Sequence, residues 1–303
     1  MANGILVIDK PAGWTSMDVC AKLRGVFHEK RVGHGGTLDP MATGVLPIFI
    51  GRATRAVEFT EKYDKEYIAE LKLGVITNTQ DITGEVLEVR PVQVSRERLE
   101  EVLEQFWGDI MQLPPMYSAI KINGKKLYEL ARKGREVERP ARPVTIKALE
   151  LLDQQGEDLY TIRVRCTKGT YIRTLCHDIG QALGCGGCMS SLRRTETAGF
   201  TLEPDCLDGA YTMDQVLAAE HPEELLLPVD YAFRDLPALV IQGRPVVLAR
   251  NGAPFPAKAP QGCRNTWHDG GLCRIYDGPR NEFLAVGRYV GQEIKIVKSF
   301  FEV

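Results

Sequence analysis

The sequence predicts a globular protein built from both helices and strands, in which a large domain precedes a small β-rich module. Three observations support this prediction. The chain has 303 residues, and at about 100–200 residues per domain this suggests two domains, or one large domain with a small module. Its residues are 44% hydrophobic and 26% charged, as in ordinary globular proteins. Apolar residues recur with helical spacing in some segments and alternate with polar residues in others.

The N-terminal third of the chain contains three predicted strands and two predicted helices. The strands cover residues 4–8, 45–50 and 67–73. Thr15 or Ser16 can cap the helix that follows the first strand, because a hydroxyl oxygen there accepts a hydrogen bond from an unpaired helical amide. Ser95 begins the clearest helix, in which apolar residues recur at i, i+3, i+4 and i+7, and Gly108 ends it.

Similar patterns continue through the middle of the chain. Strands are expected at 144–152, 159–166 and 191–200, and a helix is expected at 170–183. The segment 203–235 holds nine acidic residues, three prolines and one base, Arg234. Because its prolines interrupt regular structure and its charges favour solvent, this segment is the best candidate for a linker.

A small β-barrel is predicted at the C-terminal end. Short apolar pieces alternate there with glycines and prolines, which is the spacing of strands and tight turns. These pieces cover residues 238–241, 245–249, 274–276, 283–290 and 293–297. We therefore expect a first domain at residues 1–235 and a barrel at residues 236–303.

The charge of the chain is unevenly distributed. The formal net charge is −2, so a partner bound through overall positive charge is disfavoured. Residues 121–147, however, hold nine Lys or Arg and three Glu, which gives this segment a net charge of +6. Glycines and prolines punctuate it, and we expect a long insertion that is helical around residues 127–132. Long loops of this kind are usually functional, and this charge suits a nucleic acid.

The sequence contains no pattern for export or for a membrane span. No apolar run approaches the ~18 residues that a membrane helix needs, and the N-terminus has no basic region followed by a long apolar run. We expect a cytoplasmic protein whose eight cysteines are reduced. Cys185-Gly-Gly-Cys188 is compatible with a zinc or redox site, but no second such motif or close His pair follows. A Gly-rich loop with two thiols is the favoured interpretation, and no metal site is predicted.

A Gly-rich loop at residues 33–40 carries the strongest candidate for chemistry, Asp39. Pro40 restricts the residue before it to extended backbone, and the glycines let a ligand approach the main chain closely. A carboxylate held rigidly in such a loop can act as a nucleophile or a base, or it can simply cap a neighbouring amide. A phosphate-binding P-loop and a dinucleotide-binding fingerprint are excluded, because the Gly-Lys-Ser/Thr sequence and the third glycine are missing.

Three further side chains are candidates, each with a structural alternative. His34 lies between glycines, where its ring can project from the surface and stack on a base or fill the gap that a base leaves. Arg173, at a predicted strand-to-helix junction, can form a surface ion pair or hold a buried carboxylate ionised and oriented. Tyr67 lies on a predicted strand and is either a core aromatic or a site residue.

Six motifs, in the same order along the chain, resemble the TruB family of bacterial tRNA pseudouridine-55 synthases. They span residues 4–200, and the second motif alone is highly specific. The motifs are Lys10-Pro11-x-Gly13-x-Thr15-Ser16, Gly33-His34-x-Gly36-Thr37-Leu38-Asp39-Pro40-x-Ala42-x-Gly44-x-Leu46, Lys65-x-Tyr67, Gln112-x-Pro114-Pro115-x-x-Ser118-Ala119-x-Lys121, Lys168-Gly169-Thr170-Tyr171-Ile172-Arg173 and Leu192-Arg193-Arg194. Gly35 occupies a position that is often Thr or Ala in the family. The segment beyond residue 236 is similar to the small RNA-binding PUA-type barrel of this family.

The resemblance implies an enzyme that isomerises uridine to pseudouridine at position 55, in the T loop of tRNA, without a metal or an organic cofactor. The uridine must be flipped out of its loop to enter a pocket. By matching motif, Asp39 is the nucleophile, Arg173 pairs with it, and Tyr67 stacks on uracil and is a candidate for transfer of the C5 proton. The other implied site residues, which line the pocket or support the flipped nucleotide, are Tyr171, Leu192 and His34.

The resemblance also implies an α+β fold. A mixed, mostly antiparallel sheet would carry the site in a cleft, with helices on its outer side. A thumb-like insertion at about 114–142 would close over the RNA, and its positive charge would clamp phosphates of the T arm. The implied partner is tRNA, bound by a monomer that has no obligate protein partner.

Three other interpretations stay open. An RNA-guided, dyskerin-like pseudouridylase shares the catalytic motifs but needs protein partners and usually has longer ends, whereas only three residues precede the first predicted strand here. A tRNA-folding chaperone or binding module would have an inactive site, which the joint presence of Asp39, Tyr67 and Arg173 disfavours. A retaining glycosidase needs a second inward acid about 5–5.5 Å from Asp39, for which Asp178 and Glu66 are candidates only in principle.

Overall fold

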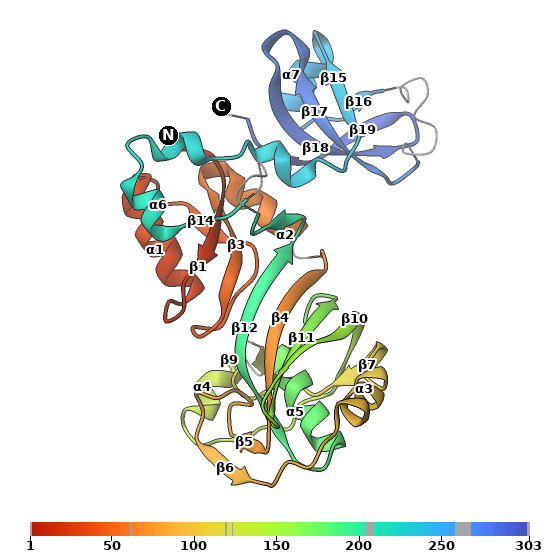
Figure 1. The fold of residues 1–303 in the computed structure, drawn as a ribbon. Helices are drawn as coiled ribbons and strands as arrows, with labels where there is room; N and C mark the ends of the chain where they lie inside the picture. The colour runs from red at the N-terminus through yellow and green to blue at the C-terminus, as the bar shows by residue number, and fades with distance from the viewer. Residues whose placement is uncertain are drawn as a thin grey trace.

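A computed structural model describes residues 2–60, 62–118, 120–122, 124–203, 209–257 and 268–301. Within these residues the chain forms a ten-stranded sheet, a five-stranded sheet near the C-terminus and two short hairpins. Figure 1 shows the C-terminal sheet at one end of the molecule, next to the half of the large sheet that is formed early in the chain. Helices and mostly antiparallel strands coexist in one body, so the expected α+β class is confirmed.

The large sheet is mixed. Its strands are β1 (Gly4–Lys10), β2 (Val32–His34), β3 (Thr43–Ile50), β4 (Lys65–Leu73), β7 (Gly108–Gln112), β10 (Arg142–Gln155), β11 (Leu159–Cys166), β12 (Gly187–Thr197), β13 (Phe200–Thr201) and β14 (Tyr211–Thr212). The main order is β14-β1-β3-β12-β4-β11-β10-β7, with β2 paired to β3 and β13 paired to β12. β12 runs parallel to β3, and β14 runs parallel to β1, while the other described pairs are antiparallel.

Short helices connect the strands and cover the sheet. The α-helices are α1 (Ser16–Val26), α2 (Val57–Thr60), α3 (Arg96–Glu104), α4 (Leu127–Ala131), α5 (Ile172–Ala182), α6 (Met213–Ala218) and α7 (Arg244–Arg250). The 3₁₀ helices are η1 (Gly51–Ala56), η2 (Pro222–Leu225), η3 (Val229–Phe233) and η4 (Gly278–Arg280). The hairpins pair β5 (Val75–Thr77) with β6 (Val86–Val89) and β8 (Lys121–Ile122) with β9 (Lys125–Lys126). Among the described residues, no helix has the length and apolar character needed to cross a membrane.

Alternation along β1 explains how the sheet separates two hydrophobic cores. Leu6 and Ile8 belong to the core shared with α1, α3 and α5, whereas Ile5 and Val7 belong to the core shared with η1 and η3. Successive side chains of a strand point to opposite faces, and all four of these are at most 1% exposed. β1 is therefore buried on both faces, which is why its sequence reads as a continuous apolar run.

The local predictions for the first helices and for β4 are confirmed. The side chains of β4 alternate between buried and half-buried, with Tyr67 and Leu71 among the buried ones. The Thr15 hydroxyl accepts a hydrogen bond from the Asp18 amide, and the Asp18 carboxylate accepts one from the Thr15 amide, so a capping box begins α1. Ser95 caps α3 in the expected position.

One helix prediction and two strand predictions differ from the structure. α3 ends at Glu104, and Gly108 instead begins β7, because a left-handed backbone there (φ of +89°) suits glycine at the entry to the strand. The apolar piece at 245–249 forms helix α7 and not a strand, which a proline in the first helical turn favours. β12 begins at Gly187 and so includes Cys188, which the sequence prediction assigned to a loop.

The prediction of a linker at 203–235 is wrong for the part of it that the structure describes. β14 pairs with the end of β1, and Leu227 forms an antiparallel bridge to Ile5 of the same strand. Met213, Val216 and Phe233 are buried in the two cores. The acidic residues lie between these apolar anchors, so the segment runs along the body of the protein and completes its sheet.

The C-terminal sheet has the order β15-β17-β18-β19-β16, with strands β15 (Ala238–Ile241), β16 (Phe255–Pro256), β17 (Leu272–Asp277), β18 (Glu282–Val290) and β19 (Glu293–Ser299). It shares a core with the rest of the protein. Phe300 stacks on Phe283 at 5.3 Å between ring centroids and lies 5.4 Å from the ring of Phe233. Two polar contacts reinforce this aromatic cluster, from Arg55 to the Ser299 carbonyl and from the Tyr276 hydroxyl to Asp230.

We predict that Phe300→Ala destabilises the protein by about 3–5 kcal/mol, because a ring that is 3% exposed leaves a cavity between the two parts of the chain. Chemical denaturation followed by circular dichroism measures this loss. Val297→Ala is the matched control, since Val297 is 39% exposed on the neighbouring strand, and we expect it to change the free energy of unfolding by less than about 1 kcal/mol. Equal effects of the two substitutions would contradict the role of the aromatic cluster.

Candidate active site

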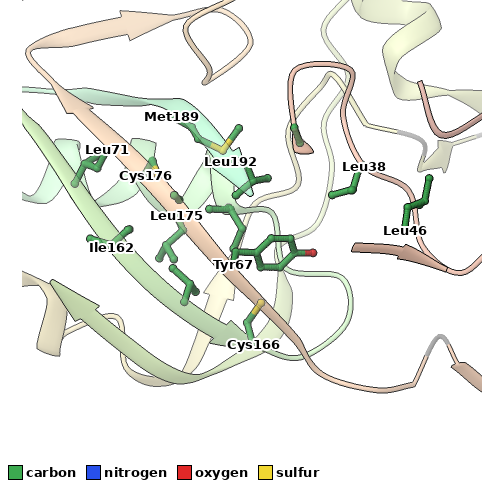
Figure 2. Packing of buried hydrophobic residues seen from close by; sticks show 14 of the residues in the cluster. Leu38, Leu46, Tyr67, Leu71, Ile162, Cys166, Leu175, Cys176, Met189 and Leu192 are labelled. Carbon is green, nitrogen blue, oxygen red and sulfur yellow. The ribbon is translucent and has the colours of Figure 1, made fainter. Parts of the chain in front are cut away.

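One large cleft of about 1290 Å³ opens at the centre of the molecule. It is lined by the β2–β3 loop, by β4 and β12, by the loop after β5, by residues near 117–132 and by the start of α5. Figure 2 shows Tyr67 extending from β4 towards the loop that carries Leu38, with Leu192 and Cys166 on its two sides. Segments far apart in the sequence therefore meet around one tyrosine ring.

Two polar side chains hold the loop that carries Asp39. The Ser16 hydroxyl accepts a hydrogen bond from the Leu38 amide at 2.9 Å and donates to the Leu38 carbonyl at 3.3 Å. The ammonium of Lys10 donates to three backbone carbonyls, including that of Pro40 at 3.3 Å. Burial lowers the pKa of Lys10 to about 8, while the nearby Asp39 carboxylate raises it. The backbone on both sides of Asp39 is therefore fixed before any substrate binds.

Asp39 forms the expected ion pair with Arg173. The distance between Arg173 Nε and Asp39 Oδ2 is 2.9 Å, and Nη2 lies 3.4 Å from Oδ1. Two parallel contacts of this kind fix the plane of the carboxylate as well as its position. The Asp39 side chain is 36% exposed, and that of Arg173 is 7% exposed, so the carboxylate faces the cleft while the guanidinium lies behind it.

Arg173 is itself held by three further groups. It donates to the Tyr117 carbonyl at 2.9 Å, to the Thr79 carbonyl at 3.3 Å and to the Asp81 carboxylate at 3.4 Å. Its place at the beginning of α5 directs it across the cleft towards the loop after β5. The guanidinium is thus shared by two carboxylates and held in one orientation.

The pKa of Asp39 is raised above its usual value. Burial is the main cause, and the negative charge of Asp81 adds to it. The positive charge of Arg173 acts in the opposite direction, as does that of Lys10 more weakly. The two cations therefore favour an ionised, reactive carboxylate in a site whose burial would otherwise favour the neutral acid.

Tyr67, Leu192 and Tyr171 line the same cleft as Asp39. Tyr67 is 7% exposed and Leu192 is 8% exposed, so the surrounding core holds both side chains in place at the wall of the cleft. Tyr171 precedes α5, where its amide donates to the Gln112 side chain at 2.7 Å and its carbonyl accepts from that side chain at 3.0 Å. These contacts set the start of α5 and, with it, the direction of Arg173.

His34 does not line the cleft itself, but it lines a neighbouring cavity that shares Tyr171 with the cleft. His34 ends β2, and this cavity of about 480 Å³ is also lined by Lys65, Arg142 and Lys168. The sequence prediction had the ring of His34 projecting from the surface. In the structure the ring is half-buried instead, because His34 belongs to β2 and β2 pairs with β3. Burial lowers the pKa of His34, and the positive charge of Arg194 lowers it further. Both effects favour the neutral form of the ring.

Sequence reasoning missed Asp81 as a site residue. Its carboxylate accepts hydrogen bonds from the Thr79 hydroxyl at 2.9 Å and from the Thr83 amide at 3.0 Å, and it reaches Arg173 from the same loop. A Thr two residues before and after an Asp is the one local signal for such a turn. This signal would predict a carboxylate held by its own turn, but it would not predict that the carboxylate pairs with Arg173.

Neither acid named for a glycosidase lines the cleft. Asp178 lies on α5, and Glu66 on β4 pairs with Arg163 at 3.4 Å. The second carboxylate of the described cleft is Asp81, which is 5% exposed and bound to the same arginine as Asp39. This arrangement does not offer a free general acid for glycoside hydrolysis.

The two thiols of the Cys-Gly-Gly-Cys motif are free and buried. Burial raises the pKa of Cys188 to about 11, so its reactive thiolate is disfavoured. Within the described part of the chain, no group of three or more His, Cys, Asp or Glu side chains is arranged to hold a metal ion.

Comparison with known proteins adds a family to this geometry. The model of the N-terminal domain of TruB family pseudouridylate synthases matches residues 24–172, and that of the tRNA pseudouridylate synthase B C-terminal domain matches residues 173–234. The tRNA pseudouridine synthase B of Alkaliphilus oremlandii is 50% identical over 79% of this chain and 78% of its own length. The chain belongs to the TruB family of pseudouridylate synthases. It is therefore an isomerase that forms pseudouridine.

Other relatives extend the match to the whole chain. The tRNA pseudouridine synthase B of Clostridium kluyveri is 40% identical over 98% of this chain and 99% of its own length. A solved structure described as a Cbf5-Nop10-Gar1 complex contains a chain with a TM-score of 0.73 and 27% identity. That match covers 99% of this chain and 85% of the other. The TruB fold thus includes both the large sheet and the C-terminal sheet described above.

We predict that Asp178→Asn stabilises this TruB protein at neutral pH. Burial raises the pKa of Asp178 from its usual value of 3.8 to about 6. The folded protein therefore binds the proton more tightly than the unfolded chain, so stability falls as the pH rises from about 4 to 6 and the cost is complete above that range. Removing the charge should raise the free energy of unfolding by about 1–2 kcal/mol at pH 7.5.

The same substitution should have almost no effect at pH 4, where the native carboxyl is protonated. Denaturation curves at the two pH values test this difference. A stabilisation that is independent of pH would show that the ionisation of Asp178 is not its source.

Proposed function

We propose that this TruB protein converts uridine 55 in the T loop of tRNA to pseudouridine, with Asp39 as the nucleophile. The tRNA substrate is supported by relatives named tRNA pseudouridine synthase B, which are 40–50% identical over most of the chain. The single observation that supports Asp39 is its ion pair with Arg173, with Nε and Oδ2 2.9 Å apart at the wall of the cleft.

The reaction requires the uridine to leave its loop. It breaks the bond between N1 of uracil and C1′ of the ribose, forms a bond between C5 and C1′, and moves one proton from C5 to N1 in net terms. A base stacked inside a folded loop exposes neither C5 nor C1′ to a protein side chain, so the nucleotide must be flipped into the cleft. A cleft of about 1290 Å³ offers room for a nucleotide and its neighbours.

Asp39 is proposed to begin the reaction as a carboxylate. It attacks C1′, attacks C6 of the base, or assists elimination to a glycal, and each of these routes needs an anion at a fixed position. Arg173 meets this need, because its two contacts orient the carboxylate and its charge favours ionisation. The isomerisation conserves atoms and electrons, so it needs no external oxidant or reductant.

The remaining cleft residues are proposed to hold the detached base. The ring of Tyr67 stacks on uracil and its hydroxyl takes part in transfer of the C5 proton, while Leu192 and Tyr171 close the pocket. All three line the cleft. His34, in the adjacent cavity, is proposed to support the nucleotide next to the flipped one.

The basic insertion at about 114–142 is proposed to close over the T arm. Tyr128 and Arg132 of this segment already line the cleft. The charges of Lys126 and Arg132 lie 5.4 Å from the centre of the Tyr128 ring on α4, so cations and an aromatic face are presented together. Phosphate contacts of this kind add affinity without reading sequence.

The chain is proposed to work as a monomer in the cytoplasm and to bind only RNA. Residues 1–235 would carry catalysis, and residues 236–303, as a PUA-like barrel, would bind another part of the tRNA. The described part of the barrel supports this division, since its five strands form a sheet of their own.

We predict that the protein converts a synthetic, unmodified T-arm stem-loop to pseudouridine at position 55 and that Asp39→Asn lowers the rate at least about a thousandfold. The amide has almost the same shape but neither the charge nor the nucleophilicity of the carboxylate. Mapping of pseudouridine in the product measures both effects. Asp178→Asn is the matched control and should retain activity, because Asp178 does not line the cleft.

Each other outcome has a clear meaning. Product formed by Asp39→Asn would contradict the nucleophile assignment. Conversion that requires a guide RNA or an added protein would favour a dyskerin-like, RNA-guided pseudouridylase. Binding without any conversion would favour a tRNA-folding chaperone.

We further predict that a variant carrying Lys125→Gln, Lys126→Gln, Arg132→Gln and Lys133→Gln binds tRNA more weakly and with a flatter salt dependence. The slope of log affinity against log salt should fall by about 0.7–0.9 for each phosphate that the native side chains neutralise. Filter binding at several salt concentrations measures the slope. Arg96→Gln with Arg98→Gln on α3 is the control, and an unchanged slope in the fourfold variant would exclude the clamp.

A further inference from the structure

Arg194, on β12, is the largest fully buried side chain among the described residues, with 0% exposure. A guanidinium stays charged at all physiological pH values, and burying that charge is costly unless neighbouring groups compensate for it. Burial lowers the pKa of Arg194, and the group that raises it is Tyr67. No carboxylate is among the described groups that act on this pKa. A buried cation without an anionic partner, directly behind an active site, needs an explanation.

Arg194 attaches the β2–β3 loop to β12, which is part of the explanation. Arg194 Nε donates to the Val45 carbonyl at 2.7 Å, and Nη2 donates to the Gly36 carbonyl at 3.1 Å. The third nitrogen, Nη1, is buried and has no hydrogen-bond partner among the described residues. The guanidinium therefore retains donor capacity that the loop does not use.

Tyr67 is the residue directly across from Arg194. The two are paired in the antiparallel ladder between β4 and β12. Residues paired in this way lie on the same face of a sheet, with Cβ atoms about 4.5–5.5 Å apart, so a long guanidinium reaches the end of a phenol ring. In Figure 2 the hydroxyl end of Tyr67 points towards the loop that carries Leu38 and Asp39.

We propose that Arg194 is a positioning residue for Tyr67: its guanidinium donates to the phenol oxygen, turns the hydroxyl proton into the cleft and stabilises the phenolate. This inference rests on the proposed function, because it concerns the step in which the C5 proton leaves. A guanidinium has five donors and no acceptor. Tyr67 therefore cannot donate to Arg194, and its proton must be directed to another group.

Among the described groups that act on the pKa of Tyr67, Arg194 is the one that stabilises the phenolate. Arg194 faces it from β12, Cys166 from β11 and Asp39 from the β2–β3 loop. Burial raises the pKa of Tyr67, and Cys166 and Asp39 also raise it, whereas Arg194 lowers it. Loss of the guanidinium would leave only influences that keep the phenol protonated.

The proton balance of the step is closed by water. The Tyr67 hydroxyl first gives its proton to a water molecule in the cleft. The bond between C5 and its hydrogen then breaks, its electron pair re-forms the C5–C6 double bond, and the proton joins the phenolate of Tyr67. N1 takes the proton that the water molecule had received, so Tyr67 ends the step as a phenol again. Arg194 keeps all its protons throughout and acts only by its charge and its hydrogen bond.

Single-turnover conversion of the T-arm stem-loop, measured from neutral to alkaline pH, tests this inference. We expect Arg194→Met to slow conversion roughly 10- to 100-fold, as for loss of a charge-assisted hydrogen bond, and to move the alkaline activation to higher pH. Arg194→Lys should slow conversion less than Arg194→Met does. In a Tyr67→Phe background, Arg194→Met should cost less than about threefold. Arg193→Met is the control, since Arg193 is 43% exposed and pairs with Asp9.

A second measurement does not depend on turnover. Fluorotyrosine placed at position 67 reports its own ionisation by ¹⁹F NMR, and the pKa should rise when Arg194 is replaced by Met. The inference would be overturned if Arg194→Met slowed conversion equally in the parent and in the Tyr67→Phe background, or if it left the titration unchanged. Arg194 would then serve only to attach the β2–β3 loop.

The outcomes separate this inference from the proposed function. A parent protein that does not convert the stem-loop refutes the proposed function, while the titration still decides whether Arg194 acts on Tyr67. If circular dichroism shows that Arg194→Met is unfolded, Arg194→Lys carries the same comparisons. A lysine variant that matches the parent in rate, pH profile and titration would overturn the need for a guanidinium donor.

Discussion

An ion pair between a cleft carboxylate and a nearly buried guanidinium, Asp39 and Arg173, is the constraint on which the site depends. Burial favours a neutral acid at position 39, and the arginine opposes this. The arginine is itself costly to bury, and Asp81 and the carbonyls of Thr79 and Tyr117 compensate by accepting its donors. Four separate segments must therefore meet correctly before a single reactive oxygen is in place. The mixed sheet brings them together.

The sequence predicts much of this through local rules and much less through distant contacts. The alternation along β4 and the cap at Thr15 follow from residues close together in the chain, and both are confirmed. The pairing of Asp39 with Arg173, 134 residues apart, is expected from motifs shared with a family and not from spacing. Asp81 escapes sequence reasoning because nothing local marks the tertiary partner of a carboxylate.

Neighbouring residues can also differ in ways that composition hides. Arg193 and Arg194 are adjacent and chemically identical, yet one is 43% exposed and the other is completely buried. Strand alternation predicts that one points inwards, but not which one. The linker prediction for 203–235 fails for a related reason, since the abundant charge of this segment outweighs the few apolar residues, such as Met213 and Phe233, that anchor it.

The aromatic contacts of Phe300 with Phe283 and Phe233 fix how the C-terminal sheet is attached. They join the C-terminal sheet to the body through packed rings and not through a flexible tether. Two surfaces held in this way keep a constant separation and a constant angle. If the C-terminal sheet binds RNA as proposed, an RNA that touches both surfaces must match that geometry in its own folded shape, and molecules of the right sequence but the wrong overall architecture would be rejected.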